Sequence, residues 1–134
     1  MAIEFTSDLE VNVPRIDEQH KSLIALINDL MVWSNAAANK DEIDKAIAHL
    51  GAYVVEHFRD EEELQRDSGY PKYDFHKREH EKFLAAFQEL KTKYDEQGAS
   101  FNFTMELNKS IIDWIMRHIK VMDKELGAFV NGKA

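Results

Sequence analysis

Two short segments of the chain place histidine and acidic residues at the spacing of a metal-chelating pair. The segment HFRDE begins with His57 and ends with Glu61, and the segment HKREH begins with His76 and ends with His80. Residues four apart on an α-helix lie above one another on the same face, so each pair can hold a metal ion. These residues therefore favour metal coordination by imidazole and carboxylate groups.

The composition narrows the possible chemistry. The chain contains no cysteine, which excludes disulfides, thiolate metal sites, iron–sulfur clusters and a cysteine nucleophile. Its formal net charge of −8 disfavours binding to nucleic acid or to anionic membrane surfaces. The N-terminus lacks the basic and apolar regions of a secretory signal, and no apolar stretch is long enough for a membrane helix. We therefore expect a cytoplasmic protein with no nucleic-acid partner and no membrane insertion.

The elements that must position these residues are expected to be helices. A length of 134 residues suits a single domain over 1–134, and 5 Gly and 2 Pro supply too few turns for a sandwich or barrel. The predicted fold is all-α: an up-down-up-down antiparallel four-helix bundle with an extended N-terminal arm over residues 1–16. Asp17 is the expected N-cap of the first helix, and the last helix is expected to end near Gly127. The expected helices span about 17–38, 41–66, 72–96 and 104–126.

Each predicted helix directs at least one histidine toward the core. The chelating pairs occupy consecutive core positions of the two middle helices, within apolar patterns whose steps alternate between four and three residues. His20 and His118 extend the apolar stripes of the first and last helices. The sixth histidine, His49, falls off the face of its helix that carries the chelating pair, so we expect it at the surface or at its boundary.

A buried cluster of this kind needs a partner. A lone histidine on an apolar face is more often a core residue whose hydrogen bonds are satisfied. Unpaired buried charges or imidazoles cost several kcal/mol each, against a typical domain stability of about 5–15 kcal/mol. Because all four helices carry inward imidazoles, a metal site is the better interpretation of the whole pattern.

The number of candidate ligands indicates two metal ions. Five imidazoles and one or two carboxylates exceed the four ligands of a tetrahedral zinc, so either some are not ligands or two ions are bound. A ligand set of nitrogen and oxygen suits iron, manganese or zinc. If Glu61 and a second acid bridge the ions, together with an oxo or hydroxo group, one position of two octahedra stays vacant. That vacancy would accept a small diatomic or anionic ligand.

The motifs, taken in order, closely resemble those of the hemerythrin family, in particular its stand-alone bacterial members. The segments IDEQH, HFRDE, HKREH and HIKVMD correspond to the family's H, HxxxE, HxxxH and HxxxxD motifs. The resemblance implies two iron ions bridged by an oxo or hydroxo group and two carboxylates, with dioxygen taken up by the iron that His20 and His57 hold. The implied ligands are His20, His57, Glu61, His76, His80, His118 and Asp123.

Asp123 enters this set through the resemblance alone. Five residues on an α-helix turn through about 500°, which places Asp123 about 140° away from His118. Met122 would be the better-placed neighbour. A π-type bulge or a tilted side chain would be needed to bring Asp123 back to the core face.

The resemblance also implies an oxygen pocket made of apolar side chains. Read as sequence alone, these are ordinary core residues, and a second role would be to keep water and protons away from bound oxygen. The implied pocket residues are Leu23, Phe58, Trp114, Ile115 and Ile119. The arm departs from the family pattern at Phe5 and Asn12, where members often have tryptophan and glycine.

Reversible dioxygen binding for storage or delivery is the leading functional hypothesis. Its chemical reason is that neutral imidazoles and two carboxylates leave the irons less electron-rich than the Glu-dominated sites of ferritin-like oxidases. An oxygen-consuming enzyme would then be a partner. The alternatives are a di-iron enzyme (a peroxidase, a ferroxidase or a nitric-oxide-handling protein), a sensor of oxygen or iron, and a bundle with structural zinc or no metal.

Overall fold

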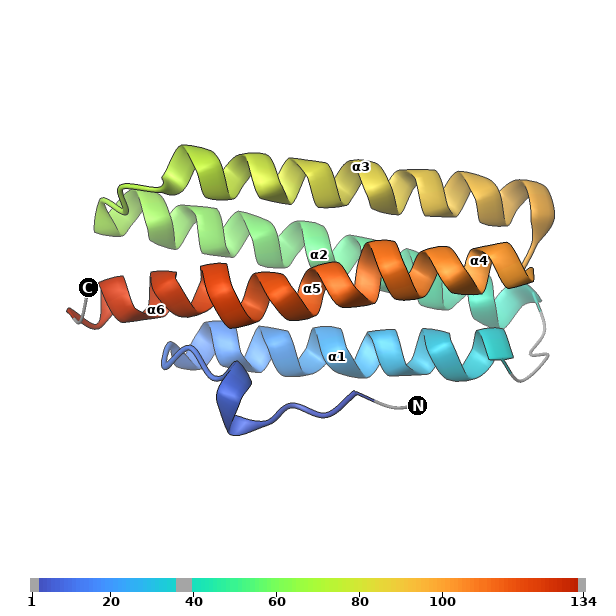
Figure 1. Cartoon of the computed structure of the whole chain (residues 1–134), viewed down its shortest axis with the longest axis horizontal. Coiled ribbons are helices and arrows are strands. Elements are labelled where there is room, and N and C mark those ends of the chain that lie inside the picture. Colours follow the sequence, from blue (N-terminus) through green and yellow to red (C-terminus); the bar gives the residue numbers. More distant parts are fainter. Residues whose placement is uncertain (1–2, 36–39, 133–134) are drawn as a thin grey trace.

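The computed structural model describes residues 3–35 and 40–132. Within them, four helical stretches run up and down beside one another, each antiparallel to the next in the chain (Figure 1). The predicted all-α four-helix bundle is confirmed, and the described part of the chain contains no strand. None of its helices is long and apolar enough to cross a membrane. The first three stretches are α1 (Pro14–Asn35), α2 (Lys40–Ser68) and α3 (Tyr73–Gln97).

The last stretch is continuous from Phe101 to Val130 but is not a uniform α-helix. Two π-helical segments interrupt it, and such segments are rare and often lie at functional sites. The first π segment spans Leu107–Ile112, and the second π segment spans Ile119–Asp123. The α-helical parts are α4 (Phe101–Glu106), α5 (Asp113–His118) and α6 (Lys124–Val130).

The start of α1 differs from the prediction for a physical reason. Pro14 occupies the first turn, where the fixed φ of proline suits a helix and its missing N–H group costs nothing. Asp17 is therefore inside the helix and is not its N-cap. Its carboxylate accepts hydrogen bonds from the backbone N–H groups of Val11 and Asn12, at 2.8 and 3.2 Å. The predicted end of this helix near 38 falls outside the described residues.

The end of the last helix also differs. Gly127 lies inside α6, which continues to Val130, so the expectation that the helix ends near Gly127 is wrong. A Cβ atom at Gly127 would collide with the backbone carbonyl oxygen of Val11. The glycine is required by the close approach of the N-terminal arm and does not mark a helix end.

The described part of the N-terminal arm, which starts at Ile3, packs against the bundle. Its 3₁₀ turn, Ser7–Leu9, buries Leu9 in the bundle core, and Val11 is also buried. Asn12 adopts a φ of 63°, in the left-handed region that Asn tolerates better than most residues. Glycine would adopt the same conformation without steric cost.

The last helix begins three residues earlier than predicted because Ser100 caps it. The Ser100 hydroxyl accepts a hydrogen bond from the Phe103 backbone N–H at 3.2 Å. Replacing a capping serine with alanine typically costs about 1 kcal/mol. We therefore expect S100A to lower the midpoint of thermal unfolding of the metal-free protein by about 4 °C, measured by circular dichroism. The control S22A, at an exposed position inside α1, should show no loss; an equal loss in both variants would contradict the cap.

Candidate metal centre

The seven ligand candidates lie together at one end of the bundle. Because neighbouring helices are antiparallel, the N-terminal halves of α1 and α3 meet the C-terminal halves of α2 and of the last helix (Figure 1). All seven side chains are buried, and they form two overlapping sets in which one ligand atom per residue lies within 4.8 Å of all the others. The first set is Glu61, His76, His80, His118 and Asp123, and the second set is His20, His57, Glu61 and Asp123.

The imidazoles of the first set converge on one point. His76 Nε2 lies 2.9 Å from Glu61 Oε1, 3.0 Å from Asp123 Oδ1 and 2.9 Å from His118 Nε2. His80 Nε2 lies 3.1 Å from Glu61 Oε1 and 3.2 Å from His118 Nε2. A ring nitrogen carries at most one proton and can donate it in one direction, so hydrogen bonds cannot satisfy all these contacts together.

A metal ion fits this arrangement. With metal–ligand bonds of about 2.1 Å, neighbouring ligand atoms of an octahedron are about 3.0 Å apart. Most of the observed separations between ligand atoms of the first set, at 2.9–3.2 Å, match that spacing, and His118 Nε2 lies farther from Glu61 Oε1, at 3.9 Å. The side chains are therefore arranged as a ligand shell around a common centre.

The second set leaves polar atoms unsatisfied. His20 Nε2 lies 2.9 Å from Asp123 Oδ2, but the two atoms are not aligned for a hydrogen bond. His57 Nε2 lies 3.4 Å from Glu61 Oε2. Both ring nitrogens of His20, together with Glu61 Oε2 and Asp123 Oδ2, are buried without a hydrogen-bond partner among the described residues. Such atoms are costly unless a cation binds them.

The two carboxylates face both sets at once. Glu61 directs Oε1 toward the first set, and its Oε2 is the oxygen nearest His57. Asp123 likewise directs Oδ1 toward His76 and His118, and Oδ2 toward His20. Each carboxylate thus offers one oxygen to each set.

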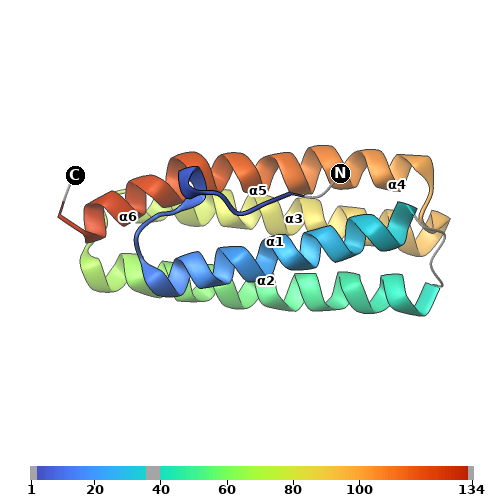
Figure 2. The same cartoon turned by 90° about the horizontal axis from the view of Figure 1, so that it is seen from below.

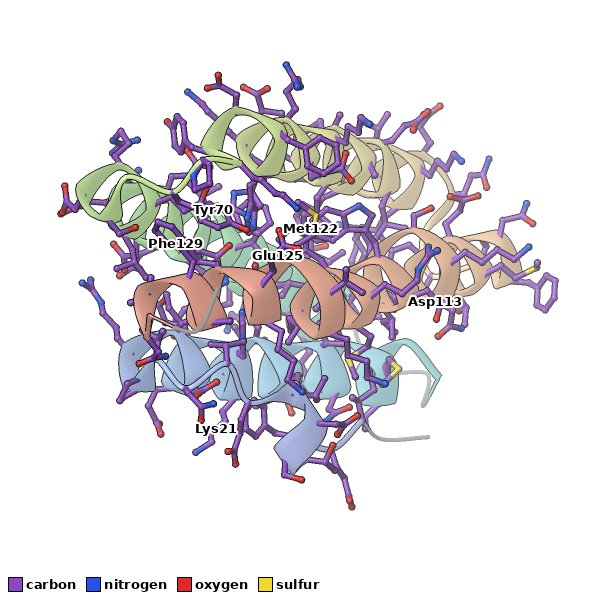
Figure 3. The ribbon with its side chains drawn as sticks, turned by 60° about the vertical axis from the view of Figure 1, so that its left-hand side comes forward. Lys21, Tyr70, Asp113, Met122, Glu125 and Phe129 are labelled. Atoms are coloured by element: carbon purple, nitrogen blue, oxygen red, sulfur yellow. The ribbon has the colours of Figure 1, made fainter. Side chains whose placement is uncertain are left out.

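Asp123 reaches the cluster through the second π segment. A π-helical turn holds one more residue than an α-helical turn, so a residue five positions after His118 returns to the inner face. Asp123 Oδ1 lies 3.1 Å from His118 Nε2 as a result. Met122, the neighbour that α-helical spacing favours, instead lines a surface pocket with Tyr70 and Glu125 (Figure 3).

Further residues that the sequence did not predict orient two of the imidazoles. His57 Nδ1 lies 2.8 Å from Gln19 Oε1, and Gln19 donates in turn to Asp60 at 2.7 Å. His80 Nδ1 lies 2.9 Å from Glu62 Oε2. Partners of this kind fix the ring so that Nε2 faces the metal. Gln19 and Glu62 are sequence neighbours of ligand candidates, but each contacts a histidine on another helix, which helical spacing does not indicate.

All five residues expected in the oxygen pocket line one small cavity of about 10 Å³. The cavity lies against His20 and His57 of the second set, and its walls are mostly apolar. Its volume is about the room that one water-sized molecule needs. Two aromatic rings stiffen the walls: Phe58 stacks on His80 with centroids 3.8 Å apart, and Trp114 stacks on His118 at 4.4 Å. His49, in contrast, is exposed, as expected.

The charges of the cluster shift several pKa values. Burial lowers the pKa of His76 and His118, but Asp123 and Glu61 outweigh that effect and raise these pKa values to about 9 and about 10. Burial raises the pKa of both carboxyl groups, and the hydrogen-bonded histidines overcome this and hold them below their ordinary values. Burial lowers the pKa of His57 to about 4. Without metal, protons on His76 and His118 therefore balance the carboxylates at neutral pH.

The fold and the cluster together define a class of protein. It is a four-helix bundle with a buried metal site built from imidazole and carboxylate groups that all four helices supply. Residues 11–130 match the family model described as the hemerythrin HHE cation binding domain. The chain belongs to the hemerythrin family, whose members are oxygen-binding proteins and not enzymes.

Individual relatives agree with this assignment. The chain is 32% identical to the bacteriohemerythrin of Methylococcus capsulatus over 121 residues, which is 90% of each chain. It is 28% identical to the myohemerythrin of Theromyzon tessulatum over 120 residues, 90% of this chain and 87% of the relative. A crystal structure of wild-type hemerythrin superposes with a TM-score of 0.85, at 30% identity and over all of both chains.

Metal binding at this site should release protons. Because the pKa values of His76 and His118 lie above 7, both rings carry protons that a metal must displace at pH 7. We expect about two or more protons to be released per fully loaded chain. The number can be measured from the heat of Co²⁺ binding in buffers of different ionisation enthalpy, because released protons add the buffer's heat. The release should fall as pH rises toward 10. The exposed-histidine variant H49Q should behave like the unmodified protein, and heats independent of the buffer would contradict the prediction.

Proposed function

We propose that this protein binds dioxygen reversibly at a two-iron centre, for oxygen storage or delivery. The observation that carries the proposal is the division of the two carboxylates, each with one oxygen toward the first set and the other toward the second set. That geometry suits two ions bridged by Glu61 and Asp123. A ligand set of imidazole and carboxylate without sulfur suits iron.

The roles of the residues follow from the two sets. His76, His80 and His118 would hold one iron, and His20 and His57 the other, with an oxo or hydroxo group as a further bridge. Bound in this way, the irons would supply electrons to dioxygen and one free coordination position. Both imidazoles of the second set, His20 and His57, border the cavity, whereas His118 is the one first-set imidazole that does. The free position on the iron with fewer imidazoles would therefore lie beside the cavity.

The cavity residues would protect the bound gas. Leu23, Val54 and Ile115 are nearly inaccessible to solvent and present hydrocarbon to the cavity. A dry, apolar wall keeps protons and bulk water from reacting with reduced oxygen, which favours release of dioxygen unchanged. Transfer of oxygen to a consuming enzyme and a cytoplasmic location both stay predictions from the sequence.

Iron content and the optical spectrum test the proposal together. The protein reconstituted without oxygen should hold two Fe²⁺ per chain, since each of the two sets would hold one ion. Adding dioxygen should produce a charge-transfer band that disappears on degassing and returns on re-oxygenation. The variant E61A should lose the band because both irons would share this carboxylate, whereas E63A, at an exposed position of the same helix, should keep it. Irreversible oxidation without a band would contradict oxygen carriage.

A polar group in the cavity wall should shorten the life of the oxygenated protein. Leu23 lines the cavity and is 2% exposed. In L23N, the amide would admit water beside the bound gas, so we expect the oxygen-dependent band to decay several-fold faster at unchanged iron content. The matched control is L26N on the same helix, since Leu26 is not among the cavity residues. Equal decay in the two variants would argue against a protective wall.

A further inference from the structure

The N-terminal arm lies across the seam between α1 and the last helix (Figure 2). Its 3₁₀ turn packs against the second π segment, the segment that carries Asp123. Leu9 of that turn is 1% exposed and belongs to the same buried core as Ile119. The arm therefore touches the bundle at the level of the metal site.

Side chains of α1 fasten the arm on one side of the seam. Asp17 accepts hydrogen bonds from the backbone N–H groups of Val11 and Asn12. Asn28 accepts from the backbone N–H of Ile3 at 2.8 Å and donates to the carbonyl oxygen of the same residue at 2.8 Å. These hydrogen bonds involve backbone groups of the arm, so they fix the course of its backbone.

The last helix fastens the arm on the other side. Lys124 donates to the backbone carbonyl oxygen of Asp8 at 2.6 Å, and the Asn131 amide donates to that of Asn12 at 3.0 Å. Between them, the arm's backbone at Val11 lies so close to Gly127 that a side chain there would not fit. Lys120 lies 3.6 Å from the Asp8 carboxylate. The contact positions 120, 124, 127 and 131 follow steps of four, three and four, so they form one stripe along the helix.

The second π segment and the helix seam both need support. The π-helix is rare and occurs mostly as a single turn inside an α-helix, so its position depends on the packing around it. His20 on α1 and Asp123 on the last helix must face each other across the seam, with His20 Nε2 and Asp123 Oδ2 2.9 Å apart. Glu61 and His57, by contrast, lie on the same helix, four residues apart.

We infer that the arm is a strap that holds the second π segment against α1 and so positions Asp123 opposite His20. The inference rests on the proposed two-ion centre and adds a positioning role for Leu9, Val11 and Gly127. It predicts an asymmetric effect. A loosened strap withdraws Asp123 and so removes one ligand candidate from each set. The second set is weakened more, because it keeps only His20, His57 and Glu61, while Glu61 and the three histidines of the first set stay in place on α2, α3 and α5.

The variant G127A tests the strap, because its methyl group would displace the backbone of Val11. In the metal-free protein, hydrogen–deuterium exchange of peptides that cover 119–123 should become at least about tenfold faster, with peptides from α3 unchanged. Titration with Co²⁺ should show the second equivalent bound about 10- to 100-fold more weakly and the first equivalent weakened by a smaller factor. The matched control is G51A, whose methyl group meets the Phe87 ring inside the bundle and does not touch the arm.

A second variant keeps the test decisive if G127A does not fold. K124M removes the bond to the Asp8 carbonyl oxygen at an exposed position, and it should change exchange and the second Co²⁺ affinity in the same direction by a smaller factor. Unchanged exchange at 119–123 and unchanged Co²⁺ binding in the folded variants would overturn the strap. If the unmodified protein binds fewer than two Co²⁺, the two-ion centre fails, and the exchange comparison in metal-free protein still decides whether the arm holds the π segment.

Discussion

The sharing of two buried carboxylates between two groups of imidazoles is the constraint on which the rest of the structure depends. Glu61 and Asp123 each turn one oxygen to each group. Neither could stay ionised in an apolar interior without several cationic or donor neighbours. All four helices must therefore place side chains at the same level of the bundle. This requirement constrains the register and direction of the helices and the position of the π-helical segment.

The alternation of apolar residues was enough to predict the bundle and most of the cluster. His57 and Glu61 occupy core positions by helical spacing, so their inward direction follows from periodicity. Asp123 does not, because its place depends on a local change in helix type that residue spacing does not reveal. Gln19 was missed for another reason: its partner is 38 positions away, and a contact between helices depends on how they pack. The sequence predicts a helix end at Gly127 because it cannot distinguish a terminating glycine from one that a neighbouring backbone approaches.

The surroundings of the cluster limit the motion of its ligands. Stacked rings on His80 and His118, and hydrogen bonds to the outer nitrogens of His57 and His80, restrain the imidazoles whether or not a metal is present. The side of the cluster that faces His20 and His57 combines this rigidity with a small apolar space. A site of this kind would keep its geometry while a small ligand enters and leaves, as the proposed reversible binding requires.

The contacts of the arm have a consequence for how the molecule folds. Its bonds to the last helix join residues 116 and 119 positions apart, close to the full length of the chain. Contacts of such long range carry the loop-closure entropy of almost the whole polypeptide, so they are favourable only after the intervening helices have assembled. During synthesis the arm emerges before α6, so it cannot make these contacts until α6 has followed. We expect docking of the arm to be the final step of folding. A chain whose translation stops before α6 would lack the contacts between the arm and the last helix.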